Sequence, residues 1–272
     1  MNNFENKFGQ TNNLYKSPYD SRDYKFKDLV PLGAFKIPDN YETERTPFIF
    51  DQGTSSMCCA ASFSTIRYMQ EADTNNGGSG ITEPFSPTFT YANRIDGEDF
   101  EGMYVRSCCK KGREGALPYS ILPGFYTLPE AKRRFNQNKD KYLEMAKPFS
   151  ISSFYQCSSR EQTQMAIMQT KGVIGAINVY KCIYNPDSEG YVRYNRLTHR
   201  KSDGGHAVVL CGWKIDNNGK LWWRMQNSWG KEYGDKGRVW IPEDMPWLDN
   251  PYAIVDTNME TKWEEYKKEY KL

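Results

Sequence analysis

Adjacent cysteines are the residues in this chain most able to act as nucleophiles. Cys58 and Cys59 stand together in "DQGTSSMCCAASF", where a loop is predicted to pass into a helix. A cysteine in the first helical turn meets unpaired N–H groups and the positive end of the helix dipole, which favour an anion. We therefore expect Cys58 to have a lowered pKa and to react as a thiolate. The alternative is a small buried apolar residue, a common role of free cysteine.

A general base for this thiol has few candidates, because the chain contains only two histidines. His199 lies in the polar, basic stretch "NRLTHRKSDGG", which predicts an exposed loop. His206 opens "GGHAVVLCGW", where two glycines precede an apolar strand and allow another chain to approach closely. A ring held at the start of a strand is suited to act as a base near neutral pH. A purely structural histidine is the alternative.

A third polar residue follows another apolar strand in "LWWRMQNSWGKEYGDKG". The amide oxygen of Asn227 can accept the imidazole N–H and hold the ring without adding a second negative charge. Trp229 can shield that hydrogen bond from water and so strengthen it. An asparagine at a strand end otherwise serves turn chemistry.

Taken in order, these motifs resemble those of papain-like cysteine peptidases. The resemblance rests on "DQG" with a cysteine six positions after Gln52, on "GGHAVVLCGW" and on "QNSWGKEYGDKGRVWI". It extends over roughly 51–241, where "SPTFTYANRID", "EGMYVRSCCKKGREGALP" and "KGVIGAINVYKCIYNPDSEGYV" are also similar to segments of the family. "SPYDSRDYKF" near the N-terminus resembles bacterial members that lack a long propeptide.

The resemblance implies a role for each matching residue in peptide hydrolysis. Cys58 would be the nucleophile, His206 its imidazolium partner, and Asn227 the residue that orients the histidine. The Gln52 amide and the Cys58 backbone N–H would form the oxyanion hole. The implied substrate-binding residues are Gly102, Ala176, Gly205 and Trp229. No metal or organic cofactor is implied, and the expected partner is a polypeptide. Two alternative functions stay open, namely a non-catalytic binding module and a related thiol hydrolase or acyltransferase acting on isopeptide or cell-wall peptide bonds.

The sequence departs from the family pattern next to the nucleophile. Ser56 and Met57 stand where the family usually has Gly-Ser, and Cys59 replaces an aromatic residue. Because one position along a helix turns a side chain by ~100°, only one of the two cysteines can face the histidine. The spacing from Gln52 selects Cys58.

Hydrophobic patterns predict a helix-rich first half and a strand-rich second half, hence an α+β fold with two lobes around a cleft. We expect an extended segment over 1–45, a helical lobe over 46–148, a β-rich lobe over 149–257 and a charged tail over 258–272. Either the extended segment lies in the cleft as a short pro-segment, or there is no zymogen. Thr54, Ser55 and Ser56 offer N-cap hydroxyls to the first long helix. Further helices are expected over 86–93, 102–111, 128–145 and 160–171, and strands over 173–180, 206–213, 221–226 and 238–241.

Composition narrows the remaining functions. The chain has 272 residues with 36 basic and 34 acidic side chains, so its net charge of +2 predicts no nucleic-acid or membrane-surface partner. There is no apolar run of the ~18 residues that a bilayer span requires. The N-terminal "MNNFENKFGQTNNLYK" lacks the apolar stretch of a secretory signal, which predicts a cytoplasmic location. The odd total of seven cysteines favours free thiols.

Overall fold

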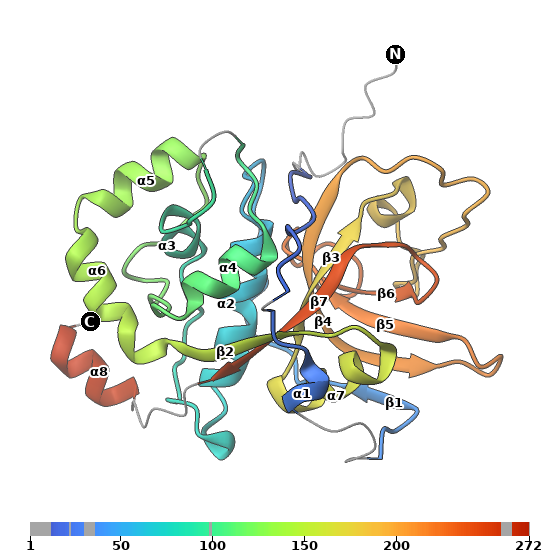
Figure 1. Cartoon of the computed structure of the whole chain (residues 1–272), viewed down its shortest axis with the longest axis horizontal. Helices are drawn as coiled ribbons and strands as arrows, with labels where there is room; N and C mark the ends of the chain where they lie inside the picture. The colour runs from blue at the N-terminus through green and yellow to red at the C-terminus, as the bar shows by residue number, and fades with distance from the viewer. Residues whose placement is uncertain (1–11, 22, 30–35, 98–99, 257–262, 272) are drawn as a thin grey trace.

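Helices gather on one side of the molecule and a twisted sheet on the other in a computed structural model of the chain (Figure 1). The structure describes residues 12–21, 23–29, 36–97, 100–256 and 263–271. The helices are α1 (Phe26–Leu29), α2 (Cys58–Glu71), α3 (Pro87–Ala92), α4 (Val105–Gly112), α5 (Leu128–Asn136), α6 (Lys139–Ala146), α7 (Arg160–Thr170) and α8 (Trp263–Tyr270). The strands are β1 (Asn40–Glu42), β2 (Ile151–Gln156), β3 (Val173–Asn178), β4 (Gly205–Ile215), β5 (Leu221–Gln226), β6 (Arg238–Pro242) and β7 (Trp247–Asp256). This confirms the predicted α+β class.

The sheet holds the elements that carry the predicted histidine and asparagine. Its strands run in the order β2-β7-β3-β4-β5-β6, with β1 paired to β4, and every pairing of these strands is antiparallel. In the β3–β4 register, Ala176 lies opposite Ala207 and Ile177 opposite His206. The strand after β4 in the sheet, β5, ends at Gln226, directly before Asn227. Because β4 and β5 are antiparallel neighbours, the start of β4 and the end of β5 bring His206 and Asn227 to the same end of the sheet.

Two apolar clusters form the core. The first fills the helical lobe and extends to the sheet, because Phe63 and Phe89 share it with Ala176 and Val209. The second lies within the β lobe, where Trp213 is fully buried together with residues of α7. Helix α2 packs against β4 and β3 and is buried along its whole length. Helix α2, which begins at Cys58, is thus the central contact between the lobes.

The predicted elements differ from the structure in several places. The helix expected over 128–145 is two helices, α5 and α6, because Asn138 leaves the helical region with φ −143° and ψ 37°. The helix expected from Gly102 begins at Val105. The hydroxyl N-cap predicted before α2 is wrong: the N-cap is Met57, which makes no side-chain cap bond. Strands β2 and β7 were not predicted, since β7 contains the polar stretch Asp249-Asn250 and Pro251.

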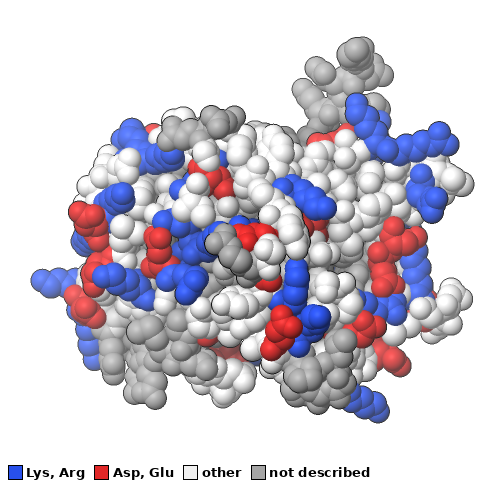
Figure 2. Space-filling view, in the orientation of Figure 1, with Lys and Arg blue, Asp and Glu red and all other residues white. Residues whose placement is uncertain are grey.

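The charged side chains show no large field of one sign on the face in Figure 2, where basic and acidic groups alternate. Ion pairs such as Arg160 with Glu243 bring opposite charges together at the surface. Within the part of the chain that the structure describes, no helix is both long and apolar enough to cross a bilayer. The charged tail is helical in α8, where the Tyr266 hydroxyl donates to the Met145 carbonyl over 2.7 Å.

Candidate active site

Cys58 is the first residue of α2 and lies against the start of β4. Its side chain is 2% exposed, and its sulfur hydrogen-bonds with the backbone of Ala207. Burial raises the pKa of the Cys58 thiol to about 12. The predicted lowering of this pKa is therefore wrong for the structure as it stands, because loss of hydration outweighs the helix N-terminus. In this arrangement Cys58 is a neutral thiol.

Cys59 faces the opposite way, into the helical lobe. Its thiol lies 3.9 Å from the Tyr104 carbonyl, and the Cys108 thiol donates to the Cys59 carbonyl over 3.9 Å. These partners belong to the N-terminal part of α4 and the residue before it. The two adjacent cysteines thus point in different directions, as expected from helical geometry. All seven cysteines are free thiols.

His206 and Asn227 form a direct pair across neighbouring strands. The His206 Nε2 and Asn227 Oδ1 atoms are 2.7 Å apart, and the indole of Trp229 lies over the imidazole with ring centroids 5.0 Å apart. Among the described residues, the buried Nδ1 atom of His206 has no hydrogen-bond partner. Burial lowers the pKa of His206 to about 4, so the ring is neutral at pH 7. His199, by contrast, is on a loop and hydrogen-bonds locally with Asn195.

Gln52 is fixed by bonds from both lobes. Its Nε2 donates to the Ser55 carbonyl over 2.7 Å, and its Oε1 accepts from the Ser228 hydroxyl over 2.6 Å. Its backbone N–H donates to the Ser228 carbonyl over 2.9 Å. Ser228 thus holds the amide oxygen, and Ser55, three positions before Cys58, holds the amide nitrogen. Ser228 also donates its N–H to Asn227 Oδ1 over 2.8 Å, and so touches two of the predicted residues.

The N-terminal chain occupies the groove between the lobes, where Figure 1 shows it passing between α4 and β3. The Leu14 N–H donates to the Gly205 carbonyl over 3.0 Å, and a side chain at Gly102 would overlap the Asn13 carbonyl. Leu14 is 3% exposed and shares an apolar cluster with Cys58 and Ala176. Two of the four predicted substrate-binding residues, Gly102 and Gly205, therefore contact this segment directly, and Ala176 shares an apolar cluster with Leu14.

Contacts on both lobes hold this segment, which we call the groove segment and define as residues 12–17. The Asn12 side-chain amide donates to the Tyr184 hydroxyl over 2.7 Å. The Ser17 N–H donates to Asp249 over 3.1 Å. Just beyond the segment, Arg106 of α4 forms ion pairs with Asp20 and with Asp23. The fourth predicted residue, Trp229, stacks with Tyr184 and so contacts the segment through one intervening ring.

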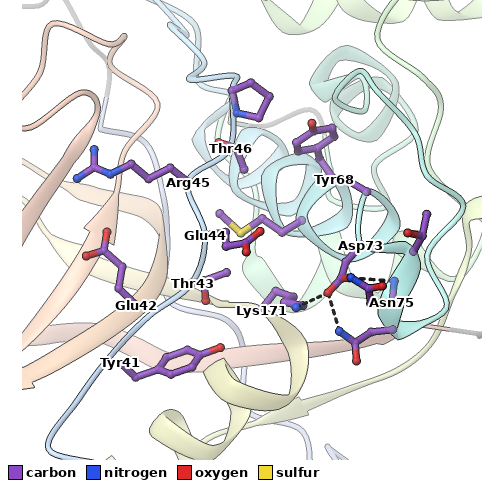
Figure 3. A pocket seen from close by; sticks show the side chains of 15 residues that line it. Tyr41, Glu42, Thr43, Glu44, Arg45, Thr46, Tyr68, Asp73, Asn75 and Lys171 are labelled. Atoms are coloured by element: carbon purple, nitrogen blue, oxygen red, sulfur yellow. Dashed lines mark hydrogen bonds and ion pairs between the residues drawn. The ribbon is translucent and has the colours of Figure 1, made fainter.

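A separate cavity of about 530 Å³ opens beside the chain over 41–47 and the C-terminal end of α2 (Figure 3). Its polar groups engage each other: Asp73 pairs with Lys171 and accepts from Asn76. None of Gln52, Cys58, His206 and Asn227 lines it. Nor do the described residues contain three histidine, cysteine or carboxylate side chains grouped as metal ligands.

Sequence reasoning missed the residues whose partners lie far along the chain. Ser228 stands inside a motif that was recognised, yet its bond to Gln52 spans 176 positions. Asn13 and Leu14 lie in a polar stretch with no periodic pattern. Leu14 is the apolar residue of this polar stretch, and it could have been predicted to be buried against the rest of the protein.

The matching family model is described as "Papain family cysteine protease" and covers residues 88–253, more than half of the chain. The matched range includes His206 and Asn227 and begins after Cys58. Cathepsin B-like cysteine proteinase 3 of Caenorhabditis elegans is 29% identical over 134 residues, which are 46% of this chain and 35% of that protein. The chain thus spans about a third of the length of this curated relative.

Solved structures share the fold. Xylellain, a cysteine protease from Xylella fastidiosa, superposes with a TM-score of 0.74 at 18% identity, covering 90% of this chain and 96% of that one. Digestive procathepsin L 3 of Tenebrio molitor gives a TM-score of 0.60 at 16% identity, covering 92% of this chain and 76% of the other. At these identities the likeness concerns the fold, and it confirms the predicted two-lobe architecture.

Proposed function

Since this chain belongs to the papain family of cysteine proteases, we propose that it is a cysteine endopeptidase acting on polypeptides through a thioester intermediate. Cys58 Sγ attacks the scissile carbonyl carbon, the C–N bond breaks, and the leaving amine takes its proton from His206. A water molecule, deprotonated by His206, then hydrolyses the thioester and releases the Cys58 thiol. No metal or organic cofactor takes part in these steps.

The observation that carries this proposal is the buried His206–Asn227 pair at the Cys58 end of the groove. An Asn227 oxygen that accepts from Nε2 fixes the tautomer and orientation of the ring, leaving Nδ1 for the thiol. Trp229 covers this bond and keeps it dry. A residue with only a structural role would have no need of an unpaired ring nitrogen at this place.

Gln52 completes the proposed machinery as an oxyanion donor. One N–H of its amide is used by the Ser55 carbonyl, and the second is left for the oxygen that becomes negative during attack. The Cys58 backbone N–H, unpaired within the helix as at any helix start, is the expected second donor. In other proteases one such donor contributes on the order of 3 kcal/mol to transition-state stabilisation.

We further propose that the groove segment holds the enzyme in a latent state. Asn13 and Leu14 occupy the position that a substrate backbone needs, between Gly102 and Gly205. The buried thiol of Cys58 and the buried imidazole of His206 are both neutral at pH 7 in this state. When the segment leaves, water reaches the pair, so the thiolate and imidazolium forms become accessible. Departure of the segment would thus free the groove and allow the Cys58 thiolate and the His206 imidazolium to form an ion pair.

Labelling with a thiol-reactive peptide electrophile tests the proposal. In the full chain with Leu14→Asp, which opens the groove, we expect covalent modification at Cys58, located by mass spectrometry, and loss of that modification when His206→Ala is added. The matched control adds His199→Ala instead, which removes the other histidine and should label as Leu14→Asp alone does. Equal labelling of both variants, or modification at Cys59 instead, would overturn the mechanism. Labelling of Cys58 without any peptide hydrolysis would favour an acyltransferase or a binding module.

A further inference from the structure

One wall of the groove carries a polar pair that the mechanism does not use. The Asn13 side-chain amide donates to the Ser56 hydroxyl over 2.9 Å, and the Ser56 hydroxyl donates to the Glu101 carboxylate over 3.3 Å. Ser56 lies two positions before Cys58 and is 2% exposed, whereas Glu101 is exposed. A hydrogen-bond donor that enters the groove here therefore meets the Ser56 hydroxyl oxygen, next to the negatively charged Glu101 carboxylate.

The backbone that carries Glu101 is held in place. Arg94 donates to the Glu101 carbonyl over 2.9 Å and to the Phe100 carbonyl over 2.7 Å. The Tyr91 hydroxyl also donates to the Glu101 carbonyl. Arg94 thus binds the main chain of this loop and leaves the Glu101 carboxylate to the groove. Within the described part of the chain, that carboxylate forms no ion pair with a basic side chain.

We infer that Ser56 and Glu101 form a subsite selecting substrates with a hydrogen-bond donor, above all arginine or lysine, next to the scissile bond. This inference rests on the proposed peptidase function. The chain's own Asn13 shows that a donor is accommodated at this place. Because Ser56 lies only two positions before Cys58, we assign the residue that contacts Ser56 to the position next to the scissile bond. Longer side chains than asparagine extend past the hydroxyl to the carboxylate, and acidic side chains are repelled.

Matched fluorogenic peptides that differ only in the residue before the reporter test the subsite. The enzyme is the full chain with Leu14→Asp, which opens the groove according to the proposal above. We expect kcat/KM to follow the order arginine, glutamine, leucine, glutamate, with about a tenfold difference between the ends of the series. Glu101→Gln should bring the arginine value close to that of glutamine and leave the leucine value unchanged. Added salt should weaken the arginine preference, because an exposed charge is screened.

The control is Asp140→Asn on α6, which makes the same change in net charge away from the groove. Binding of the same peptides to full-length Leu14→Asp with Cys58→Ala, measured by anisotropy, reads the subsite without catalysis. A donor preference in binding that Glu101→Gln removes would support the inference even if no peptide were hydrolysed, a result that would sink only the peptidase proposal. Equal binding of arginine, leucine and glutamate peptides, or a preference that survives Glu101→Gln, would overturn the subsite.

Discussion

The two walls of the groove differ in how far their residues are already arranged for the proposed reaction. The β wall carries His206 and Asn227, and the α wall carries Cys58. On the β wall, His206 and Asn227 already make their hydrogen bond of 2.7 Å, and Trp229 covers them. On the α wall, Cys58 is in position at the start of α2, but burial holds it as a neutral thiol. The β wall is fixed by bonds between neighbouring strands, which form together with the sheet. Under the latency proposal, the state of the α wall would depend on a segment more than forty positions earlier in the chain.

This difference indicates that orientation and reactivity are controlled separately. In the proposed mechanism, the orientation of His206 would belong to the permanent fold, whereas the charge state of Cys58 would depend on the groove segment. Variants on one wall should therefore change different observables from variants on the other.

The largest effect is expected for the α wall itself. Cys58→Ala should lower peptide hydrolysis by at least about 10⁴-fold, because no other group can form the thioester. Cys59→Ala is the matched control and should stay within a few-fold of the wild type, since Cys59 faces α4. Initial rates with a fluorogenic peptide in reducing buffer make the measurement. Comparable losses in both variants would show that the two cysteines do not have separate roles.

Acid should unfold the protein through the β wall. The folded pKa of His206, about 4, is below its ordinary value of 6.5, so the unfolded chain takes up this proton first. Stability from this group is full above pH 6.5 and is lost as the pH falls towards 4, a change of about 3 kcal/mol. The free energy of unfolding in urea, measured for the wild type and for His206→Gln between pH 4 and 6.5, isolates the contribution of His206. An identical pH slope in the two proteins would contradict it.

Opening the groove should have a smaller effect on rate. Leu14→Asp places a charge in an apolar site and loses the burial of one leucine, about 1.5–3 kcal/mol. We expect hydrolysis to rise by about 10-fold or more, and iodoacetamide to alkylate Cys58 at a lower pH than in the wild type. Tyr19→Asp, at a side chain 87% exposed, should change neither quantity. A rate that stays flat in Leu14→Asp, with the fold intact by circular dichroism, would mean that the segment does not inhibit.

The smallest effect is expected for the hydrogen bond between Ser228 and Gln52, which joins the two walls. Ser228→Ala frees the Gln52 amide to rotate, and we expect kcat to fall about 5-fold, as for the loss of one neutral hydrogen bond of about 1 kcal/mol. Alkylation of Cys58 by iodoacetamide needs no oxyanion hole and should keep its rate. A fall in alkylation as large as the fall in kcat would assign Ser228 to the fold at large.

Local motifs allowed the sequence to predict the family, the strands β3, β4, β5 and β6, and a site that contains Cys58, His206 and Asn227. Periodicity was enough for these strands, and the family and the site residues followed from the resemblance of three short motifs. The pKa of Cys58 could not be predicted in this way, because it depends on burial that distant residues complete. The Ser228–Gln52 bond and the Ser56–Glu101 pair likewise join separate parts of the chain, and only the folded arrangement brings them together.

The covalent connection of the groove segment to the enzyme has a consequence for concentration. Just after it in the chain, Asp20 and Asp23 pair with Arg106, and Lys25 donates to Gln156. A tethered occupant acts at an effective concentration on the order of millimolar, however dilute the protein is. Dilution alone should therefore never activate this enzyme, and a substrate competes best when it engages more of the groove than the segment does. Cutting the tether would convert a permanent occupant into one that diffuses away.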